Sequence, residues 1–362
     1  MKNKLPLPLW TLAAPLAAWL VYLAKSLFAG GAFALGMAVV LVGAIMAAVH
    51  HAEVVAHRVG EPFGTLLLAV AVTIIEVSLI VSLMVAGGPE TTTLARDTVF
   101  AAVMIIITLM IGLCLLLGGA RHKEQHFVRY GVSAALVTLT AIAVLTLVLP
   151  NYTTSVAGPV YSPSQLTFVA VVSLVLYGTF VLVQAVRHRD YFLAPGPETE
   201  TGEAVHAPPP TRQATLLSAV LLVVGLAAVV LLAKALSPTI EAGVAAAGAP
   251  KSLVGILVAF VILLPEGVAA LRAARQNRLQ TSLNLALGSA LASIGLTIPA
   301  VAIVSLATGM TITLGIDTKS TVLLVLSLFT VALSFGTGRT TVLQGVVLLV
   351  IFAVYLFTTI VP

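Results

Sequence analysis

Apolar residues run in long stretches along this chain, and short polar segments separate them. Eleven stretches approach or exceed the roughly 18 residues that a helix needs to cross a hydrocarbon core of about 30 Å. They lie near residues 7–24, 30–50, 62–86, 94–118, 130–150, 165–187, 213–236, 250–272, 281–309, 319–337 and 341–361. The pattern predicts an all-α polytopic membrane protein with about 11 transmembrane helices.

Two carboxylates interrupt these apolar stretches. Of the 13 acidic residues, only Glu76 and Glu266 lie deep within a predicted span, and no Lys or Arg lies at a comparable depth. An ionisable side chain inside a membrane segment indicates a functional site by default. The other interpretation is structural, with two protonated carboxyl groups that only hydrogen-bond helices together.

The distribution of Lys and Arg predicts which way the spans run. With a cytoplasmic N-terminus, 13 of the 18 basic residues fall in inner segments and 5 in outer ones. Inner loops of membrane proteins carry the excess of positive charge. We therefore expect the N-terminus inside and, with an odd number of spans, the C-terminus outside. The net charge of +5 then follows from topology, and a nucleic-acid partner is not needed to explain it.

The spans divide into two similar groups. Glu53 precedes Glu76 by 23 residues, and Glu241 precedes Glu266 by 25, which indicates a weak internal repeat. Five spans in each repeat would give the two copies opposite orientations, as in secondary transporters with sites near the membrane midplane. The predicted segments are an extra N-terminal helix in 1–29, a first repeat in 30–187, an acidic, proline-rich cytoplasmic linker in 188–213, and a second repeat in 214–362.

Glutamates in this setting can exchange a proton for a cation. A carboxylate enclosed by apolar surroundings is stabilised by either a proton or a metal ion, so the two compete. Ca²⁺ prefers six to eight oxygen ligands from carboxylates, carbonyls and hydroxyls. Thr73, on the same helix face as Glu76, and Ser289, just after the helix of Glu266, are available hydroxyls. Pro265 removes a backbone N–H beside Glu266 and so frees a carbonyl one turn earlier.

Three stretches carry a resemblance to a known family: 60–83, with Glu76; 95–105, ARDTVFAAVMI; and 251–300, with Glu266. They resemble the bacterial calcium/proton antiporters of the ChaA type, in the CAX branch of the cation/Ca²⁺ exchanger superfamily. The resemblance covers nearly the whole chain. It implies that Glu76 and Glu266 bind the cation and exchange protons, and that Ser289 is a motif serine. It also implies a bacterial inner membrane.

The sequence departs from that family at positions that supply ligands. Many members have Gly-Asn before each glutamate, where this chain has Val72-Thr73 and Ile262-Leu263. Fewer side-chain oxygens leave room for Na⁺ or K⁺ in place of Ca²⁺.

The hypothesis is therefore a secondary antiporter that exports Ca²⁺ in exchange for protons by alternating access. A Na⁺ or K⁺/proton antiporter on the same fold is the first alternative. A cation channel is a weaker one, because few polar side chains lie within the spans. We expect no enzyme activity, since no nucleophile–base or metal-ligand set lies at depth, and no cofactor beyond the transported ions.

Asp97 and Asp317 each lie beside the outer start of a span. They could line an access funnel or cap helices, and capping is the preferred interpretation.

Overall fold

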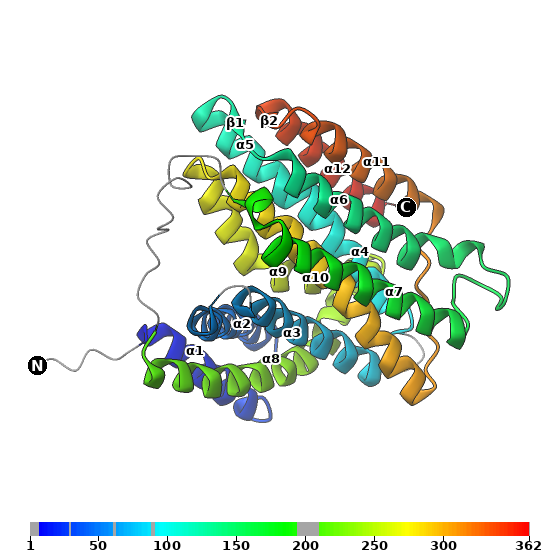
Figure 1. Ribbon diagram of the computed structural model, residues 1–362. Helices are drawn as coiled ribbons and strands as arrows, with labels where there is room; N and C mark the ends of the chain where they lie inside the picture. Colours follow the sequence, from blue (N-terminus) through cyan, green and yellow to red (C-terminus); the bar gives the residue numbers. More distant parts are fainter. Residues whose placement is uncertain (1–6, 29, 61–62, 88–90, 194–209, 362) are drawn as a thin grey trace, which may run out of the picture. The chain divides into compact units, whose positions relative to one another are not determined.

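The computed structural model describes residues 7–28, 30–60, 63–87, 91–193 and 210–361 (Figure 1). Ten helices in this part of the chain are long and apolar enough to cross a membrane. This confirms the predicted all-α polytopic fold. The predicted first span forms helix α1 (Leu9–Ala24), whose 16 residues make it shorter than those ten. Of the predicted linker, residues 194–209 lie outside the described residues.

The chain forms two compact units, which are described separately. The first combines Met1–Gly87 with Val205–Ala249, and the second combines Gly88–Ala204 with Pro250–Pro362. The helices of the first unit are α1, α2 (Gly31–Val59), α3 (Phe63–Gly87) and α8 (Arg212–Ala246). Helix α2 packs against each of the other three. The apolar surface of this unit is therefore organised around α2.

A buried histidine joins three of these helices. His51 on α2 has no exposed surface. Its Nε2 lies 3.0 Å from the carbonyl oxygen of Thr11 on α1, and its Nδ1 lies 3.3 Å from Oγ of Ser218 on α8. A neutral ring satisfies both contacts when Nε2–H donates to Thr11 and Nδ1 accepts from Ser218. The arrangement ties the shorter helix α1 to the unit.

We expect His51→Leu to lower the stability of the first unit by about 1–3 kcal/mol, because it leaves buried polar partners on α1 and α8 without their hydrogen bonds. Thermal unfolding in detergent measures the effect. His57→Leu is the matched control, since His57 lies on the same helix and is exposed. Equal melting temperatures for the two variants would contradict a structural role for His51.

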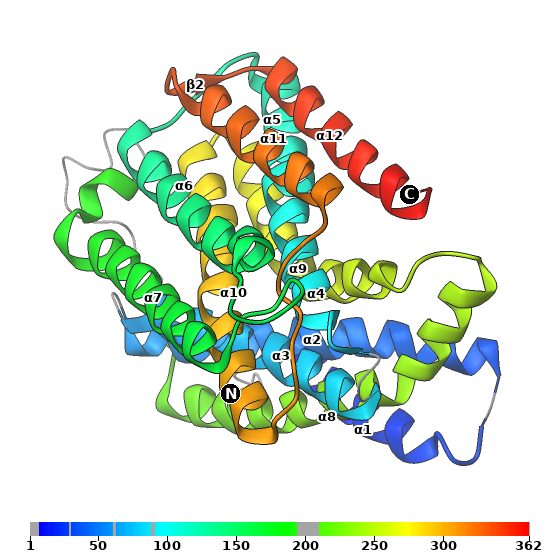
Figure 2. The ribbon, with the colours of Figure 1, turned by 90° about the vertical axis from the view of Figure 1, so that its right-hand side faces the viewer.

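The second unit contains the remaining helices and one short pair of strands. In chain order its elements are α4 (Leu94–Met104), η2 (Ile105–Met110), α5 (Ile111–His122), β1 (Gln125–His126), α6 (Arg129–Ala143), η3 (Val144–Val148), η4 (Leu149–Tyr152), α7 (Pro163–Leu182), η5 (Val183–Arg187), η6 (Arg189–Phe192), α9 (Ser252–Arg275), α10 (Leu279–Thr308), α11 (Thr318–Phe335), β2 (Arg339–Thr340) and α12 (Val342–Ile360). Helix α10 contacts α4, α5, α6, α7 and α9. It forms the centre of this unit (Figure 2).

Contacts in the second unit join helix ends that the predicted topology places on the same side of the membrane. Strands β1 and β2 pair antiparallel, with Gln125 opposite Thr340 and His126 opposite Arg339. The side chain of Gln125 also donates to the carbonyl of Ala274 and to Asn277, each at 3.0 Å. The ends of α5, α9 and α11 therefore meet, as alternating crossings require.

Several helices extend beyond the apolar stretches that predict them. Helix α2 continues through the polar residues after His50 and ends at Val59, and the residue that caps it is Gly60, whose φ of 78° suits glycine. Helix α8 passes through Pro238 and ends at Ala246, ten residues beyond the predicted span. Residues such as Ala, Glu and Arg favour a helix in water as well, so a helix does not have to end where its apolar stretch ends.

Candidate cation site

The first predicted site residues lie on α3, in the first unit. Glu76 is buried, with 4% of its surface exposed, and Thr73 with 7%. Glu76 lies 13 residues after the start of α3 and 11 before its end, or about 20 and 16 Å along the axis. Both distances are near half of a hydrocarbon core about 30 Å thick. The structure thus places this carboxylate near the middle of a membrane-length helix.

Thr73 keeps an oxygen available despite its own hydrogen bond. Its hydroxyl donates to the carbonyl of Ala69 at 2.8 Å. A hydroxyl that donates to its own helix retains lone pairs on the oxygen. Thr73 lies three residues before Glu76, which places the two on one helix face. The face can offer a carboxylate and a hydroxyl oxygen to a cation.

Glu266 lies on α9, in the second unit. Its side chain is half-buried, and its Oε2 atom is enclosed by protein. Pro265, directly before it, is buried inside the helix. Proline cannot donate the backbone hydrogen bond of a regular turn, so a carbonyl one turn earlier loses that partner. The carboxylate and the proline lie side by side in α9, which runs as one helix from Ser252 to Arg275.

Ser289 lies on α10 at the same depth as Glu266. Helices α9 and α10 contact each other and are joined by a short turn. Glu266 is 9 residues before the end of α9, and Ser289 is 10 residues after the start of α10. The two positions therefore lie about 14 and 15 Å from the turn. Ser293, one turn further along α10, is buried.

A π-helical segment beside α9 is a feature that the sequence did not reveal. Element η2 joins α4 to α5 and contacts α9 and α10. A Cβ atom at Gly267, next to Glu266, would lie 3.5 Å from Cε of Met110 in η2. The same segment holds Thr108, a buried threonine whose hydroxyl donates to the carbonyl of Met104. π-Helical turns occur often at functional sites. The apolar run IIITLM carries no signal for one.

The predicted residues therefore form two groups, Glu76 with Thr73 on α3 and Glu266 with Ser289 at one depth on α9 and α10. Within the described residues, no set of three or more His, Cys, Asp or Glu side chains gathers as a metal cluster. A cation held by either glutamate would need its other oxygens from hydroxyls and backbone carbonyls. That the two glutamates share one ion stays a prediction.

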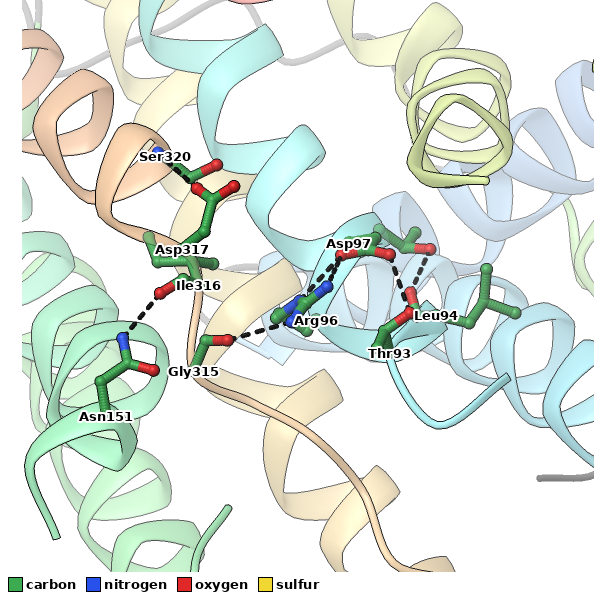
Figure 3. A network of polar contacts seen from close by, with 10 residues as sticks. Thr93, Leu94, Arg96, Asp97, Asn151, Gly315, Ile316, Asp317 and Ser320 are labelled. Atoms are coloured by element: carbon green, nitrogen blue, oxygen red, sulfur yellow. Dashed lines mark hydrogen bonds and ion pairs between the residues drawn. The ribbon is translucent and has the colours of Figure 1, made fainter. Parts of the chain in front are cut away.

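A polar network lies at the predicted outer end of the second unit (Figure 3). Arg96 pairs with the carboxylate of Asp97 at 2.8 Å and donates to the carbonyl of Gly315 at 3.1 Å. Asn151 donates to the carbonyl of Ile316 at 2.6 Å. These bonds fix the segment between α10 and α11 against the start of α4 and against η4. A cavity of about 220 Å³ opens beside the network.

The two aspartates of this network have different roles. Asp317 caps α11, because its side chain accepts from the backbone N–H of Ser320 at 2.6 Å. Burial alone would raise the pKa of Asp317, but hydrogen bonds from Ser320 and the charges of Lys319 and Arg96 hold that pKa below its ordinary value. The capping prediction is wrong for Asp97. Thr93 occupies the N-cap of α4, and Asp97 lies in the first turn.

Comparison with known sequences shows where this arrangement belongs. The sequence profile described as sodium/calcium exchanger protein matches residues 28–186 and 217–361. The chain belongs to this family. Its members are membrane transporters, so the family assignment agrees with the expectation that the chain is not an enzyme. The resemblance to cation/Ca²⁺ exchangers is thereby confirmed.

Individual relatives of this exchanger cover most of the chain. The protein y4hA of Sinorhizobium fredii is 50% identical over 325 residues, which are 89% of this chain and 87% of that protein. The sodium-potassium/proton antiporter ChaA of Escherichia coli is 37% identical over 310 residues, 86% of this chain and 84% of ChaA. The crystal structure of the H⁺/Ca²⁺ exchanger CAX shares the fold, with a TM-score of 0.70 and 17% identity over 96% of this chain and 87% of that chain.

Proposed function

We propose that this exchanger is a proton-coupled antiporter in which Glu76 and Glu266 alternately hold protons and a cation, and that it exports Ca²⁺. The observation that carries the proposal is the placement of both glutamates near the middle of membrane-length helices. Carboxylates at that depth are costly unless they bind protons or cations. The relative ChaA, named a proton antiporter, supports proton coupling.

Charge counting favours Ca²⁺ as the cargo. The two glutamates supply two negative charges, which one divalent cation or two protons neutralise completely. Either state can then cross between access states without a net charge on the site, at a low desolvation cost. A single Na⁺ would leave one carboxylate charged unless a proton accompanied it.

Na⁺ or K⁺ is the second candidate cargo. The name of ChaA supports it, and so does the absence of amide side chains at Thr73 and Leu263. Monovalent cations require fewer strong ligands than Ca²⁺.

The two-repeat organisation is part of the proposal. The family profile matches two separate segments, close to the predicted repeats 30–187 and 214–362, and this supports two copies, which five spans each would place in opposite orientations. Alternating access would then expose the glutamates to each side in turn. The proposed location is the bacterial inner membrane, with the N-terminus in the cytoplasm and the C-terminus outside. The transported ions are cargo, and no resident cofactor is proposed.

Proteoliposomes with an imposed pH gradient test the proposal. The full chain is reconstituted, a pH-sensitive dye is enclosed, and Ca²⁺, Na⁺ or K⁺ is added separately. We expect micromolar Ca²⁺ to dissipate the gradient. If only millimolar Na⁺ or K⁺ dissipates the gradient, the protein is still a proton-coupled antiporter, but its cargo is that monovalent ion and not Ca²⁺. A gradient that survives all three ions, in vesicles shown to contain folded protein, would contradict the antiporter itself.

A further inference from the structure

A groove of about 580 Å³ lies between α6 and α11 in the second unit, and the cation mechanism does not use it. The two helices lie side by side (Figures 1 and 2). One wall comes from a single face of α6, between Arg129 and Ala141, and the other from the end of α11, between Ala332 and Gly336. Both walls belong to membrane-length segments.

One end of the groove is polar and positively charged. Arg129 is exposed there, and one nitrogen of its guanidinium donates to the carbonyl of Gly336 at 2.9 Å. That bond orients the group and leaves other N–H donors available, because a guanidinium carries five. Among the described residues, no carboxylate forms an ion pair with Arg129. Tyr130 and Ser133 add exposed hydroxyl groups at the same end.

The rest of the groove is apolar except for Thr140, and together with its polar end the groove is about as long as one lipid leaflet. Leu136, Val137 and Ala141 continue this wall along α6, and Ala332 of α11 lines the opposite wall. The distance from Arg129 to Ala141 is about 18 Å along the helix, compared with about 15 Å for half of the hydrocarbon core. Val137 is 67% exposed in the chain. A groove of this length suits one lipid, with the headgroup at the polar end and part of one acyl chain on the apolar wall.

We propose that this groove binds an anionic phospholipid, with the headgroup phosphate on Arg129 and one acyl chain along α6 and α11. The position of the charge and the direction of the groove both match a phospholipid in one leaflet. The cation lies at the end of a span, at headgroup level, and the apolar wall begins at Leu136, about two turns deeper. Arginine binds phosphate oxygens through paired N–H donors. Basic pockets between membrane helices bind anionic headgroups by the same chemistry.

Native mass spectrometry of the full chain in detergent tests this site. The protein is titrated with phosphatidylglycerol or with phosphatidylcholine of the same acyl chains. We expect wild type to prefer phosphatidylglycerol, and Arg129→Gln to weaken that binding about tenfold, because it removes a charge-assisted phosphate contact. Arg121→Gln is the matched control. Arg121 is exposed on the last turn of α5 and does not line the groove.

A second variant keeps the test informative if Arg129→Gln loses stability. Val137→Trp fills the apolar part of the groove and leaves the guanidinium in place, so we expect weaker binding of both lipids and an unchanged melting temperature. Equal affinity of wild type for the two lipids would overturn the proposal, as would unchanged phosphatidylglycerol binding in either variant. A change of oligomer mass in Val137→Trp with unchanged lipid binding would assign the groove to a second copy instead.

Discussion

Replacing either Glu76 or Glu266 by glutamine is expected to abolish ion-coupled proton movement. Glutamine keeps the size of the side chain and cannot release a proton or supply a negative charge. Removing one charge from a buried charged site costs about 3–5 kcal/mol, or on the order of a hundredfold or more in binding. The measurement is cation-induced dissipation of a pH gradient in proteoliposomes, with each variant reconstituted at equal density.

Glu124→Gln controls for the loss of a carboxylate elsewhere. Glu124 lies outside the spans and pairs with Arg339 at 3.3 Å on the surface, where such a pair contributes little. Its exchange should match wild type. Retained exchange in Glu76→Gln or Glu266→Gln, with melting temperatures equal to wild type, would eliminate the two-carboxylate mechanism. Loss of exchange in both variants would support the two-carboxylate mechanism, and the separate additions of Ca²⁺, Na⁺ and K⁺ would then identify the cation.

Gly345→Ala is expected to destabilise the second unit by about 1–3 kcal/mol, the usual cost of overpacking. Gly345 lies where α12 crosses α5, and a Cβ atom there would lie 2.5 Å from the backbone nitrogen of Leu116 and 2.8 Å from the carbonyl oxygen of Gly112. Backbone atoms cannot rotate away as a side chain does, so the helices must separate. Thermal unfolding in detergent measures the change.

Gly178→Ala is the control for helix propensity. A Cβ atom at Gly178 on α7 meets nothing within 4 Å. Alanine favours a helix over glycine by up to about 1 kcal/mol, so this variant should be equal to or slightly more stable than wild type. If Gly345→Ala lowers the melting temperature and Gly178→Ala does not, close backbone packing at Gly345 is the cause. Equal stabilisation would show that α12 and α5 can separate without cost.

The sequence predicted the features that depend on hydrophobic length. Ten of the eleven predicted spans are membrane-length helices, and these, the positions of Glu76 and Glu266 along their helices and the cap at Asp317 follow from apolar runs and local side-chain chemistry. The alternating crossings agree with the contacts at both ends of the second unit. Each of these features is set by a short stretch of chain, and such stretches can be read without knowing the packing.

Features that depend on packing could not be predicted. The role of His51 requires α1 and α8 to lie beside α2, although they are 40 and 167 residues away in the sequence. The contact between Gly345 and α5 is equally remote. Thr108 looks like an isolated hydroxyl in an apolar run, and only the π-helical turn distinguishes it. Close approach and helix irregularity are properties of neighbouring helices, so single-chain patterns do not contain them.

The π-helical turn η2 divides one long helix into two parts that pack against different neighbours. The part before it, α4, packs against α9, and the part after it, α5, packs against α12 as well. Each residue of a regular helix turns its side chain by about 100°, so an additional residue within one wide turn changes which face the following part presents. The two parts of this long helix can therefore pack against different partners, as two shorter helices joined end to end would.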